Sequence, residues 1–448
     1  MVGKEVFLMR IAQVAPLWES VPPRTYGGSE LVVSLLTDEL VRRGHEVTLF
    51  AAQDSQTAGN LVPCCPLSLR DMEAQVIQDK THCTVMSYEL SMLQQVFERA
   101  GEFDVIHNHV GFQPLPFADF VSTPMVTTLH NALEPMPVKA LFLRNAHLPY
   151  IAISHYQQQL WPELNYAGTI YHGIQLQKFE PSLTHPEQPY LVFLGRLSPE
   201  KGPHHAIRIA RDLKLPLILA GKIDRVDQVY YDREIAPLVD GEQIRYIGEV
   251  DHTQKVSLLR HAAATLCPVA WPEPFGLVMI ESMACGTPVF ALRDGSIPEV
   301  VDHGITGYVA DSVEELTQAV SRYLDYDRSR IRQVAEQRFS VERMVDDHLA
   351  VYRALAEQAQ GKTVAFSRDD KPDWMTAALG ATEILALSPF SMPIPKNPPS
   401  TKRGMTGHKN RLINHRETAV LPPPELNLAP IPNPDDYGSY YSDANTGP

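Results

Sequence analysis

The strongest constraint on the fold is a regular alternation of short apolar runs with amphipathic helical segments. The run at 11–15 has the length of a buried strand, and a loop rich in proline and glycine follows it. Residues 29–43 then carry apolar side chains at helical spacing, Gly44 closes that segment, and 45–52 is a second strand-length run. Strands that alternate with helices in this way predict parallel βαβ units and a doubly wound sheet.

The alternation occurs twice, which predicts two α/β domains. Further strand-length runs lie at 105–107, 125–129, 150–153, 190–194, 216–220, 244–247, 265–267, 289–291 and 308–309. We predict one Rossmann-like domain over residues 1–178, a second over 179–340, and a helix over 341–360. Ligands of open parallel sheets bind beyond the carboxyl ends of the strands, so two such domains predict a site in a central cleft.

Composition and charge exclude several classes of protein. The 448 residues suffice for two or three domains, and a formal net charge of −14 argues against nucleic-acid binding. The five cysteines are irregularly spaced and form no CxxC pattern, which favours a reduced, cytoplasmic compartment. No apolar run reaches the roughly 20 residues of a membrane-spanning helix, although a peripheral position at a membrane stays open. Arg10 and Gln13 interrupt the first apolar run, so we interpret it as a strand and not as a leader.

The last segment, 361–448, differs in composition. It holds 13 of the 37 prolines, several of them in clusters that exclude helix and central strand. We predict a mostly disordered tail, with one short amphipathic helix over 374–387. A solvated tail is the simpler interpretation, and docking of a partner is the alternative.

The segment 272–289 is the most informative for chemistry, because it predicts a helix over 276–285 followed by a strand. A helix N-terminus presents free N–H groups and a partial positive charge, which suits a phosphate. Glu273 precedes the helix and Glu281 lies more than a turn inside it. Carboxylates beside a diphosphate are favourable if they bind hydroxyls, so the pair indicates a sugar at one end and a ribose at the other. The alternative is that Glu273 caps the helix and Glu281 is solvated.

Two further segments extend the anion site. Arg196 follows a predicted strand and Lys201 precedes a helix that begins near Pro203, a position that proline favours. Two cations in this place can stabilise charge on a departing diphosphate, although surface cations of no function are the alternative. Gly27 and Gly28, at the start of the first helix, allow a ligand to approach the backbone closely. They form no GxGxxG pattern, which argues against a typical NAD enzyme.

These segments together resemble the family-4 glycosyltransferases of the GT-B fold, over residues 9–358. The hallmark is a pair of glutamates with seven residues between them, here Glu273 and Glu281, followed by CGTPV and preceded by GRLxxxKG. The resemblance implies retaining transfer of a sugar from a nucleotide-diphosphate donor, commonly UDP- or GDP-linked. We expect no metal ion or other cofactor, because the protein's own cations can stabilise the diphosphate. It also implies that the first domain is the acceptor side, that the second binds the donor, and that the helix over 341–360 crosses back onto the first domain.

The resemblance also assigns roles to individual residues. Arg196 and Lys201 hold the diphosphate, Glu281 binds the ribose hydroxyls, and Glu273 binds hydroxyls of the donor sugar. The segment 247–250 matches the strand end that contacts the base. The implied donor-binding residues are Gly27, Gly28, Arg196, Lys201, Val250, Phe275, Gly276, Leu277, Val278 and Glu281, and the implied catalytic residues are His130, Arg196, Lys201 and Glu273.

Several histidines follow predicted strands of the first domain. His130 ends such a strand and so faces the cleft, where the resemblance places it near the reacting carbon of the donor sugar; loop capping is the alternative. His107 and His109 have the spacing of a metal-binding pair but no evident third ligand, so we interpret them as acceptor-side or structural. Ser154 and His155 follow another strand and are further cleft candidates.

Two routes to retention are open. A covalent glycosyl-enzyme needs a carboxylate beneath the anomeric carbon, and the strand ends of the first domain offer His and Asn instead. We therefore favour attack from the face that the diphosphate leaves, with the leaving phosphate taking the acceptor's proton. Asp325 and Asp327 form a DxD-like triplet after a predicted helix at 314–324, and we interpret it as a solvated loop, not a metal site.

The acceptor and two alternative functions stay open. By the family's pattern, the acceptor contacts the first-domain segments 53–88 and 111–149, and nothing there distinguishes a glycan, a lipid or a small molecule. One alternative is another GT-B enzyme, such as a sugar-nucleotide epimerase or a pyridoxal-dependent phosphorylase. The other is a non-catalytic nucleotide-sugar-binding protein.

Overall fold

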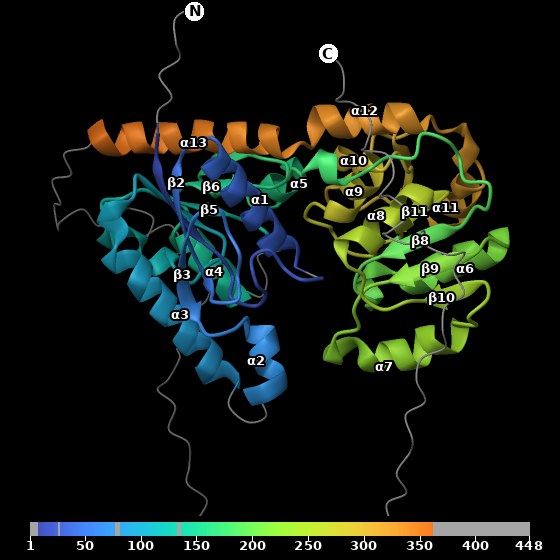
Figure 1. Ribbon diagram of the computed structural model, residues 1–448, viewed down its shortest axis with the longest axis horizontal. Coiled ribbons are helices and arrows are strands. Elements are labelled where there is room, and N and C mark those ends of the chain that lie inside the picture. Colours follow the sequence, from blue (N-terminus) through green and yellow to red (C-terminus); the bar gives the residue numbers. More distant parts are fainter. Residues whose placement is uncertain (1–7, 26, 77–80, 132–135, 362–448) are drawn as a thin grey trace, which may run out of the picture. The chain divides into compact units, whose positions relative to one another are not determined.

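The computed structural model describes residues 8–25, 27–76, 81–131 and 136–361, which contain two parallel sheets (Figure 1). The first sheet has the order β3-β2-β1-β4-β5-β6-β7 and the second has the order β10-β9-β8-β11-β12-β13. Strands of the first sheet are β1 Arg10–Val14, β2 Glu46–Ala52, β3 Asn60–Cys65, β4 Val105–Asn108, β5 Met125–Thr128, β6 Tyr150–Ala152 and β7 Tyr166–Thr169. Strands of the second are β8 Leu191–Leu194, β9 Leu217–Ala220, β10 Ile244–Tyr246, β11 Ala264–Cys267, β12 Val289–Leu292 and β13 Gly307–Ala310.

The predicted pair of doubly wound sheets is confirmed. Every named strand pair is parallel, and each sheet runs outward in both directions from its first strand. β1 lies between β2 and β4, and β8 lies between β9 and β11. The chain direction across each sheet reverses at these strands, and open α/β sheets bind ligands beyond the carboxyl ends of the strands at such a switch point.

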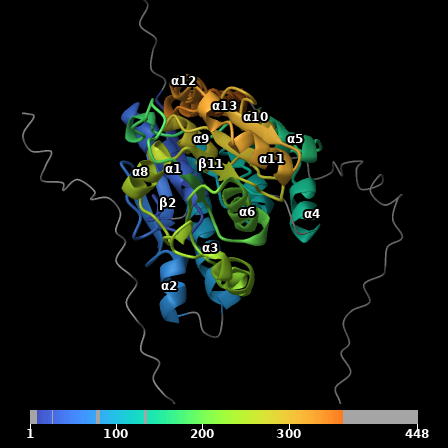
Figure 2. The ribbon, with the colours of Figure 1, turned by 90° about the vertical axis from the view of Figure 1, so that its right-hand side faces the viewer.

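Helices cover both faces of each sheet. The named α-helices are α1 Gly28–Arg42, α2 Leu69–Val76, α3 Thr81–Glu98, α4 Met136–Arg144, α5 His155–Leu160, α6 Pro203–Leu213, α7 Gln228–Tyr230, α8 His252–His261, α9 Leu277–Ala284, α10 Ile297–Val300, α11 Val313–Val320, α12 Arg328–Arg338 and α13 Val341–Gly361. Neighbouring side chains of β8 show the two faces, since Phe193 belongs to the apolar core with α6 and α11 whereas Val192 belongs to the core with α8, α9 and α12. In Figure 2, α8 lies to the left of β11, and α6 and α11 lie to its right.

The long helix α13 returns to the first sheet after the second is complete. Its buried side chains recur every three or four residues, which gives one apolar stripe. The helix packs along α1 and against β4, and Figure 1 shows it running beside the first half of the chain. The position of α13 brings Tyr352, which is fully buried, next to the strand ends of the first sheet.

The sequence analysis missed the two edge strands of the first sheet. β3 contains Pro63, which removes a backbone donor, and β7 is a short run that contains Gly168. Residues 53–88 accordingly hold β3, α2 and the start of α3. The predicted helix at 314–324 ends at Val320, and a 3₁₀ turn follows over Tyr323–Asp325. The predicted tail over 361–448, with its helix at 374–387, lies outside the described residues except for Gly361.

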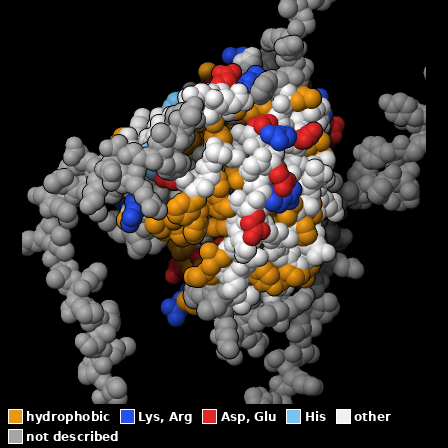
Figure 3. All heavy atoms as spheres, turned by 90° about the vertical axis from the view of Figure 1, so that its left-hand side faces the viewer, with side chains coloured by type: hydrophobic (Ala, Val, Ile, Leu, Met, Phe, Trp, Pro, Cys, Tyr) orange, Lys and Arg blue, Asp and Glu red, His pale blue; other side chains and the backbone are white. Residues whose placement is uncertain are grey.

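The first half of the chain also exposes apolar side chains. Figure 3 shows hydrophobic side chains gathered on the face that is turned left in Figure 1. Exposed large side chains of this half include Met86 and Leu90 of α3 and Phe120 of the turn at Leu115–Phe120. No helix within the described ranges has the length and hydropathy that crossing a bilayer requires.

Candidate active site

A cavity of about 1040 Å³ lies at the carboxyl edges of both sheets. Loops after β1, β8, β9, β10 and β11 line it, together with the first turns of α1 and α9. The loops after β1, β8 and β11 lie at the switch points of the two sheets, where the fold places ligand sites. The volume is that of a pocket for a ligand of drug size or larger.

The N-terminus of α9 opens into this cavity. Gly276 precedes the helix with φ of 85°, and no side chain caps the helix. This left-handed conformation favours glycine, and a Cβ atom on Gly276 would lie 2.5 Å from Cε of Met279. Leu277 and Val278, whose backbone N–H groups are the free donors of the first turn, line the cavity as expected. Phe275 is 2% exposed, and its ring packs edge-on against the His172 ring at the wall of the cavity.

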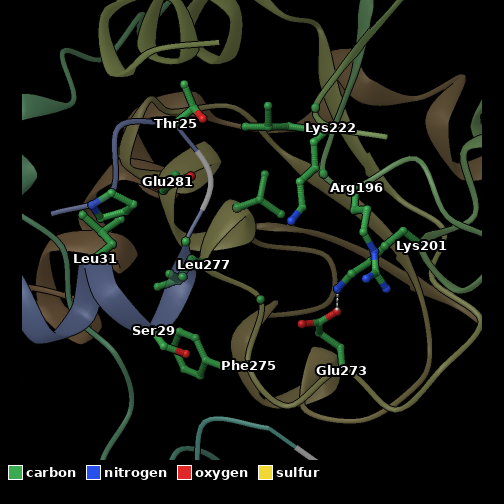
Figure 4. A pocket seen from close by; sticks show the side chains of 18 of the residues that line it. Thr25, Ser29, Leu31, Arg196, Lys201, Lys222, Glu273, Phe275, Leu277 and Glu281 are labelled. Atoms are coloured by element: carbon green, nitrogen blue, oxygen red, sulfur yellow. Dashed lines mark hydrogen bonds and ion pairs between the residues drawn. The ribbon is translucent and has the colours of Figure 1, made fainter. Parts of the chain in front are cut away.

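Three cationic side chains gather at one side of the cavity, as Figure 4 shows. Arg196 and Lys201 come from the loop after β8, as predicted, and Lys222 comes from the loop after β9. The sequence analysis missed Lys222 because it belongs to no local motif. Together with the positive end of α9, the three cations form a site for a polyanion.

Arg196 is held by acidic neighbours. It forms an ion pair with Glu200 and two further pairs, with Asp224 at 3.3 Å and Asp227 at 3.5 Å. Asp224 also pairs with Lys222 at 3.0 Å. A diphosphate that binds Arg196 therefore competes with carboxylates already in place, which sequence reasoning did not foresee.

Glu273 lies directly against Lys201. The two form an ion pair, drawn in Figure 4, and the Trp271 indole donates a hydrogen bond of 3.0 Å to the same carboxylate. The Lys201 ammonium also lies 5.0 Å from the Trp271 ring centre. Glu273 does not cap α9, so that alternative is wrong. The carboxylate lies between the cation cluster and the start of α9, where it can accept hydrogen bonds from hydroxyl groups.

Glu281 is 4% exposed, so the alternative of a solvated helix residue is also wrong. Its carboxylate forms an ion pair with Lys255 of α8, a residue that the sequence analysis missed. Both side chains line the cavity. A carboxylate this deeply buried requires a partner, and Lys255 supplies one while one face of the pair stays toward the cavity.

The first half of the chain contributes the start of α1. Gly27 has φ of 152°, and a Cβ atom on it would lie 2.7 Å from Cβ of Pro23. A Cβ atom on Gly28 would lie 3.5 Å from Cδ1 of Leu277, so α1 and α9 meet at their N-termini. Thr25 donates a hydrogen bond of 2.7 Å to Glu249, next to Val250. Gly27, Gly28 and Val250 all line the cavity.

His130 lines the cavity, whereas His107 and His109 lie behind it. His109 Nδ1 is 2.8 Å from His130 Nε2, and the His172 ring stacks on His130 with 5.5 Å between centroids. Burial lowers the pKa of His130 to about 3, and the nearby His348 lowers it further. His130 is therefore a neutral imidazole at physiological pH, able to exchange hydrogen bonds with a ligand but not to carry charge.

Two carboxylates of the first half also reach the cavity, from positions other than the strand ends that the sequence analysis considered. Glu19 lies in the loop after β1 and pairs with Arg70, and Glu30 lies in the first turn of α1. Burial raises the pKa of Glu19 to about 7 and also raises the pKa of Glu30. Neither residue ends a strand, which explains why the sequence analysis overlooked them.

Ser154 and His155 do not line the large cavity, so that expectation is wrong. The Ser154 hydroxyl caps α5 by accepting a bond from the Gln157 N–H, and the His155 N–H donates to Glu299. Asp327 of the DxD-like triplet caps α12. No cluster of three or more His, Cys, Asp or Glu side chains suited to a metal ion occurs in the described part of the chain.

Two parallel doubly wound sheets that share a cavity at their carboxyl edges are the architecture of the GT-B glycosyltransferases. The model of "Glycosyltransferase Family 4" matches residues 26–178, and that of "Glycosyl transferases group 1" matches residues 175–338. The two matches follow one another and span both sheets. The chain belongs to the family-4 glycosyltransferases and is a transferase that moves glycosyl groups.

Individual relatives agree with this assignment. A glycogen synthase of Mycobacterium tuberculosis is 25% identical over 84% of this chain and 94% of its own length. A D-inositol 3-phosphate glycosyltransferase of Mycolicibacterium smegmatis is 25% identical over 74% of this chain and 87% of its own. The fold is similar to that of Anabaena Alr3699/HepE, solved with UDP and glucose, with a TM-score of 0.60, 20% identity and coverage of 79% and 100%.

Proposed function

We propose that this protein transfers a hexose-type sugar from a nucleoside-diphosphate sugar to an acceptor hydroxyl, with retention of the anomeric configuration. One observation carries the proposal. A cluster of three cations and a helix N-terminus lies in one cavity with a buried, lysine-paired carboxylate, Glu281. The cations and the helix N-terminus can bind a diphosphate, and the Glu281 carboxylate can accept hydrogen bonds from ribose hydroxyls.

The relatives support the donor class. Alr3699/HepE has been solved with UDP-glucose, and the Mycobacterium relative is named a glycogen synthase. The cavity of this chain offers Val250 and its neighbours after β10 for the base, and Glu273 for the sugar. The donor base is the part of the reaction that thermal unfolding with a set of nucleotides addresses first.

The chemistry that we propose is attack on the same face that the diphosphate leaves. The acceptor oxygen bonds to the anomeric carbon while the bond from that carbon to the phosphate oxygen breaks, and the acceptor's proton passes to the departing phosphate. Arg196, Lys201 and the N-terminus of α9 stabilise the developing charge. Glu19 is held in an ion pair with Arg70, and burial raises the pKa values of both Glu19 and Glu30, so their ionised forms are less favourable here than in water. A sugar trapped covalently on either carboxylate would refute this route.

We further propose that the reaction needs no metal ion. The side chains that surround the anion site include three cations, which take the place that a divalent ion fills in metal-dependent transferases. Activity that disappears in chelator and returns with manganese would contradict this part.

The test is thermal unfolding in the presence of UDP, GDP, ADP and their common sugar conjugates. A ligand present at about 100 times its dissociation constant adds about 2.7 kcal/mol, which shifts the melting temperature measurably. We expect one base to give this shift, and Glu281→Gln to remove it. Glu314→Gln, on the exposed start of α11, is the matched control and keeps the shift. A protein that no nucleotide stabilises would contradict the proposed donor.

A further inference from the structure

A continuous chain of hydrogen bonds runs from α13 to His130. Gln13 of β1 is fully buried at its centre. The Gln13 Nε2 group donates to the Tyr352 hydroxyl at 3.2 Å, and Gln13 Oε1 lies 2.7 Å from His109 Nε2. His109 Nδ1 lies 2.8 Å from His130 Nε2, which ends this arm at the cavity.

A second arm starts at the same tyrosine. The Tyr352 hydroxyl lies 2.5 Å from His107 Nδ1, and His107 Nε2 lies 2.7 Å from the Thr128 hydroxyl. All these groups are buried, so each hydrogen bond must have one donor and one acceptor. Because the Tyr352 hydroxyl has one proton, its donation to His107 would fix the direction of the bonds along the arm through Gln13.

The shortest bond sets the direction. Hydroxyl donors form shorter hydrogen bonds than N–H donors do, so the 2.5 Å separation indicates that Tyr352 donates to His107. The Tyr352 oxygen is then the acceptor for the Gln13 Nε2 group, which leaves Gln13 Oε1 to accept from His109 Nε2–H. A neutral His109 consequently accepts at Nδ1, and His130 Nε2–H is the donor to it.

This direction determines what His130 offers to a ligand. Its Nε2–H group is committed to His109, and its Nδ1 atom has no hydrogen-bond partner among the described residues. The His172 ring stacks on one side of His130 and packs edge-on against Phe275, which restricts the plane of the imidazole. An imidazole in this state presents a lone pair and accepts a hydrogen bond from a hydroxyl group.

We propose that Gln13, His109 and Tyr352 are positioning residues that hold His130 in its Nε2–H tautomer, so that Nδ1 accepts a hydrogen bond from a sugar hydroxyl in the cavity. The identity of the ligand rests on the proposed function, whereas the tautomer does not. Helix α13 thereby supplies a side chain on which the arrangement of the site depends, in addition to covering the first sheet.

The direct test is ¹⁵N NMR of the full chain labelled at histidine, because a protonated ring nitrogen and a bare one resonate far apart. The His130 signals are assigned by their loss in His130→Asn. We expect a protonated Nε2 and a bare Nδ1 in the native protein. In Gln13→Met, which removes both bonds of the amide, we expect signals of both tautomers. A native His130 protonated at Nδ1, or an unchanged tautomer in Gln13→Met, would overturn the proposal.

The second test uses turnover and separates positioning from folding. Tyr352→Phe is compared with Tyr150→Phe, a control that also removes one buried hydroxyl, here bonded to the Asn145 carbonyl at 2.9 Å, outside this chain of bonds. We expect Tyr352→Phe to lower kcat about tenfold, the effect of about 1.4 kcal/mol on the barrier, with the donor KM and the nucleotide Kd within about twofold. We expect Tyr150→Phe to keep kcat.

The two tests fail in distinguishable ways. An equal loss of kcat in both tyrosine variants would show a merely structural role and overturn the proposal. The NMR test needs neither the sugar donor nor the acceptor substrate, so an unexpected tautomer of His130 would count against the positioning role alone. Absence of binding by every nucleotide would count against the proposed function and leave the tautomer measurement intact.

Discussion

At the scale of single residues, the site is organised by buried ion pairs. Glu281 and Lys255 lie on different helices, α9 and α8, and each is less than a fifth exposed. Burying an unpaired carboxylate costs free energy, so the ammonium group of Lys255 stabilises the charge of Glu281, the residue that the family resemblance assigns to the ribose. The pair of Glu273 and Lys201 has the same form at the other end of the cavity.

We predict that Lys255→Met destabilises the fold by about 3 kcal/mol, because it leaves the Glu281 carboxylate buried without its partner. The double variant with Glu281→Gln should recover most of this loss, since an amide carries no charge. Urea unfolding followed by circular dichroism measures both values. Arg208→Met breaks an exposed pair with Glu314 and should change the stability by less than about 0.5 kcal/mol. Additive losses in the double variant would contradict the prediction.

At the scale of elements, two helix N-termini converge on one cavity. Both α1 and α9 begin at a glycine-containing turn, and neither has a side-chain cap. The first N–H groups of each helix are consequently available to a ligand, and the approach of Gly28 to Leu277 brings the two sets together.

This geometry predicts the effect of a single methyl group at Gly276. Gly276→Ala places a Cβ atom against Met279 in a left-handed conformation, whereas Gly304→Ala meets the same conformation with open space around it. We expect Gly304→Ala to cost about 1 kcal/mol from the backbone alone, and Gly276→Ala to cost more. We also expect only Gly276→Ala to weaken nucleotide binding, measured by calorimetry. Equal effects of the two variants on both quantities would contradict the role assigned to this turn.

At the scale of the whole molecule, the sequence predicted those features that depend on residues close together in the chain. Central parallel strands are continuous apolar runs, and the cations and glutamates of the motifs lie beside helix starts, so the sheets and many cavity residues could be found. Lys222, Lys255 and Glu19 could not, because each reaches the cavity from an element that carries no motif. The bonds from Tyr352 through Gln13 join residues 339 positions apart, which only the fold brings together.

The same long-range packing buries several histidines between the first sheet and α13, and this predicts acid sensitivity. Burial lowers the pKa of His130 to about 3 and of His348 to about 4. His107, His109 and His172, packed around them, are also shifted downward by burial and by neighbouring imidazoles. Below a pH of about 6.5, the unfolded chain binds a proton at each site that the folded chain refuses, so these groups favour unfolding increasingly as pH falls.

His348→Gln isolates one of these contributions. Glu19 and Glu30 have raised pKa values and act in the opposite direction, so the total slope of stability against pH mixes both kinds of group. Subtracting the free energy of unfolding of His348→Gln from that of the native protein at each pH removes the contributions that the two proteins have in common. As the pH falls from about 6 to about 4.5, we expect the free energy of unfolding to decrease more steeply in the native protein than in His348→Gln. The two slopes should differ by up to about 1.4 kcal/mol per pH unit. Urea unfolding at several pH values measures both slopes, and parallel slopes would mean that His348 takes up its proton in the folded state, contrary to its burial between α13 and the first sheet.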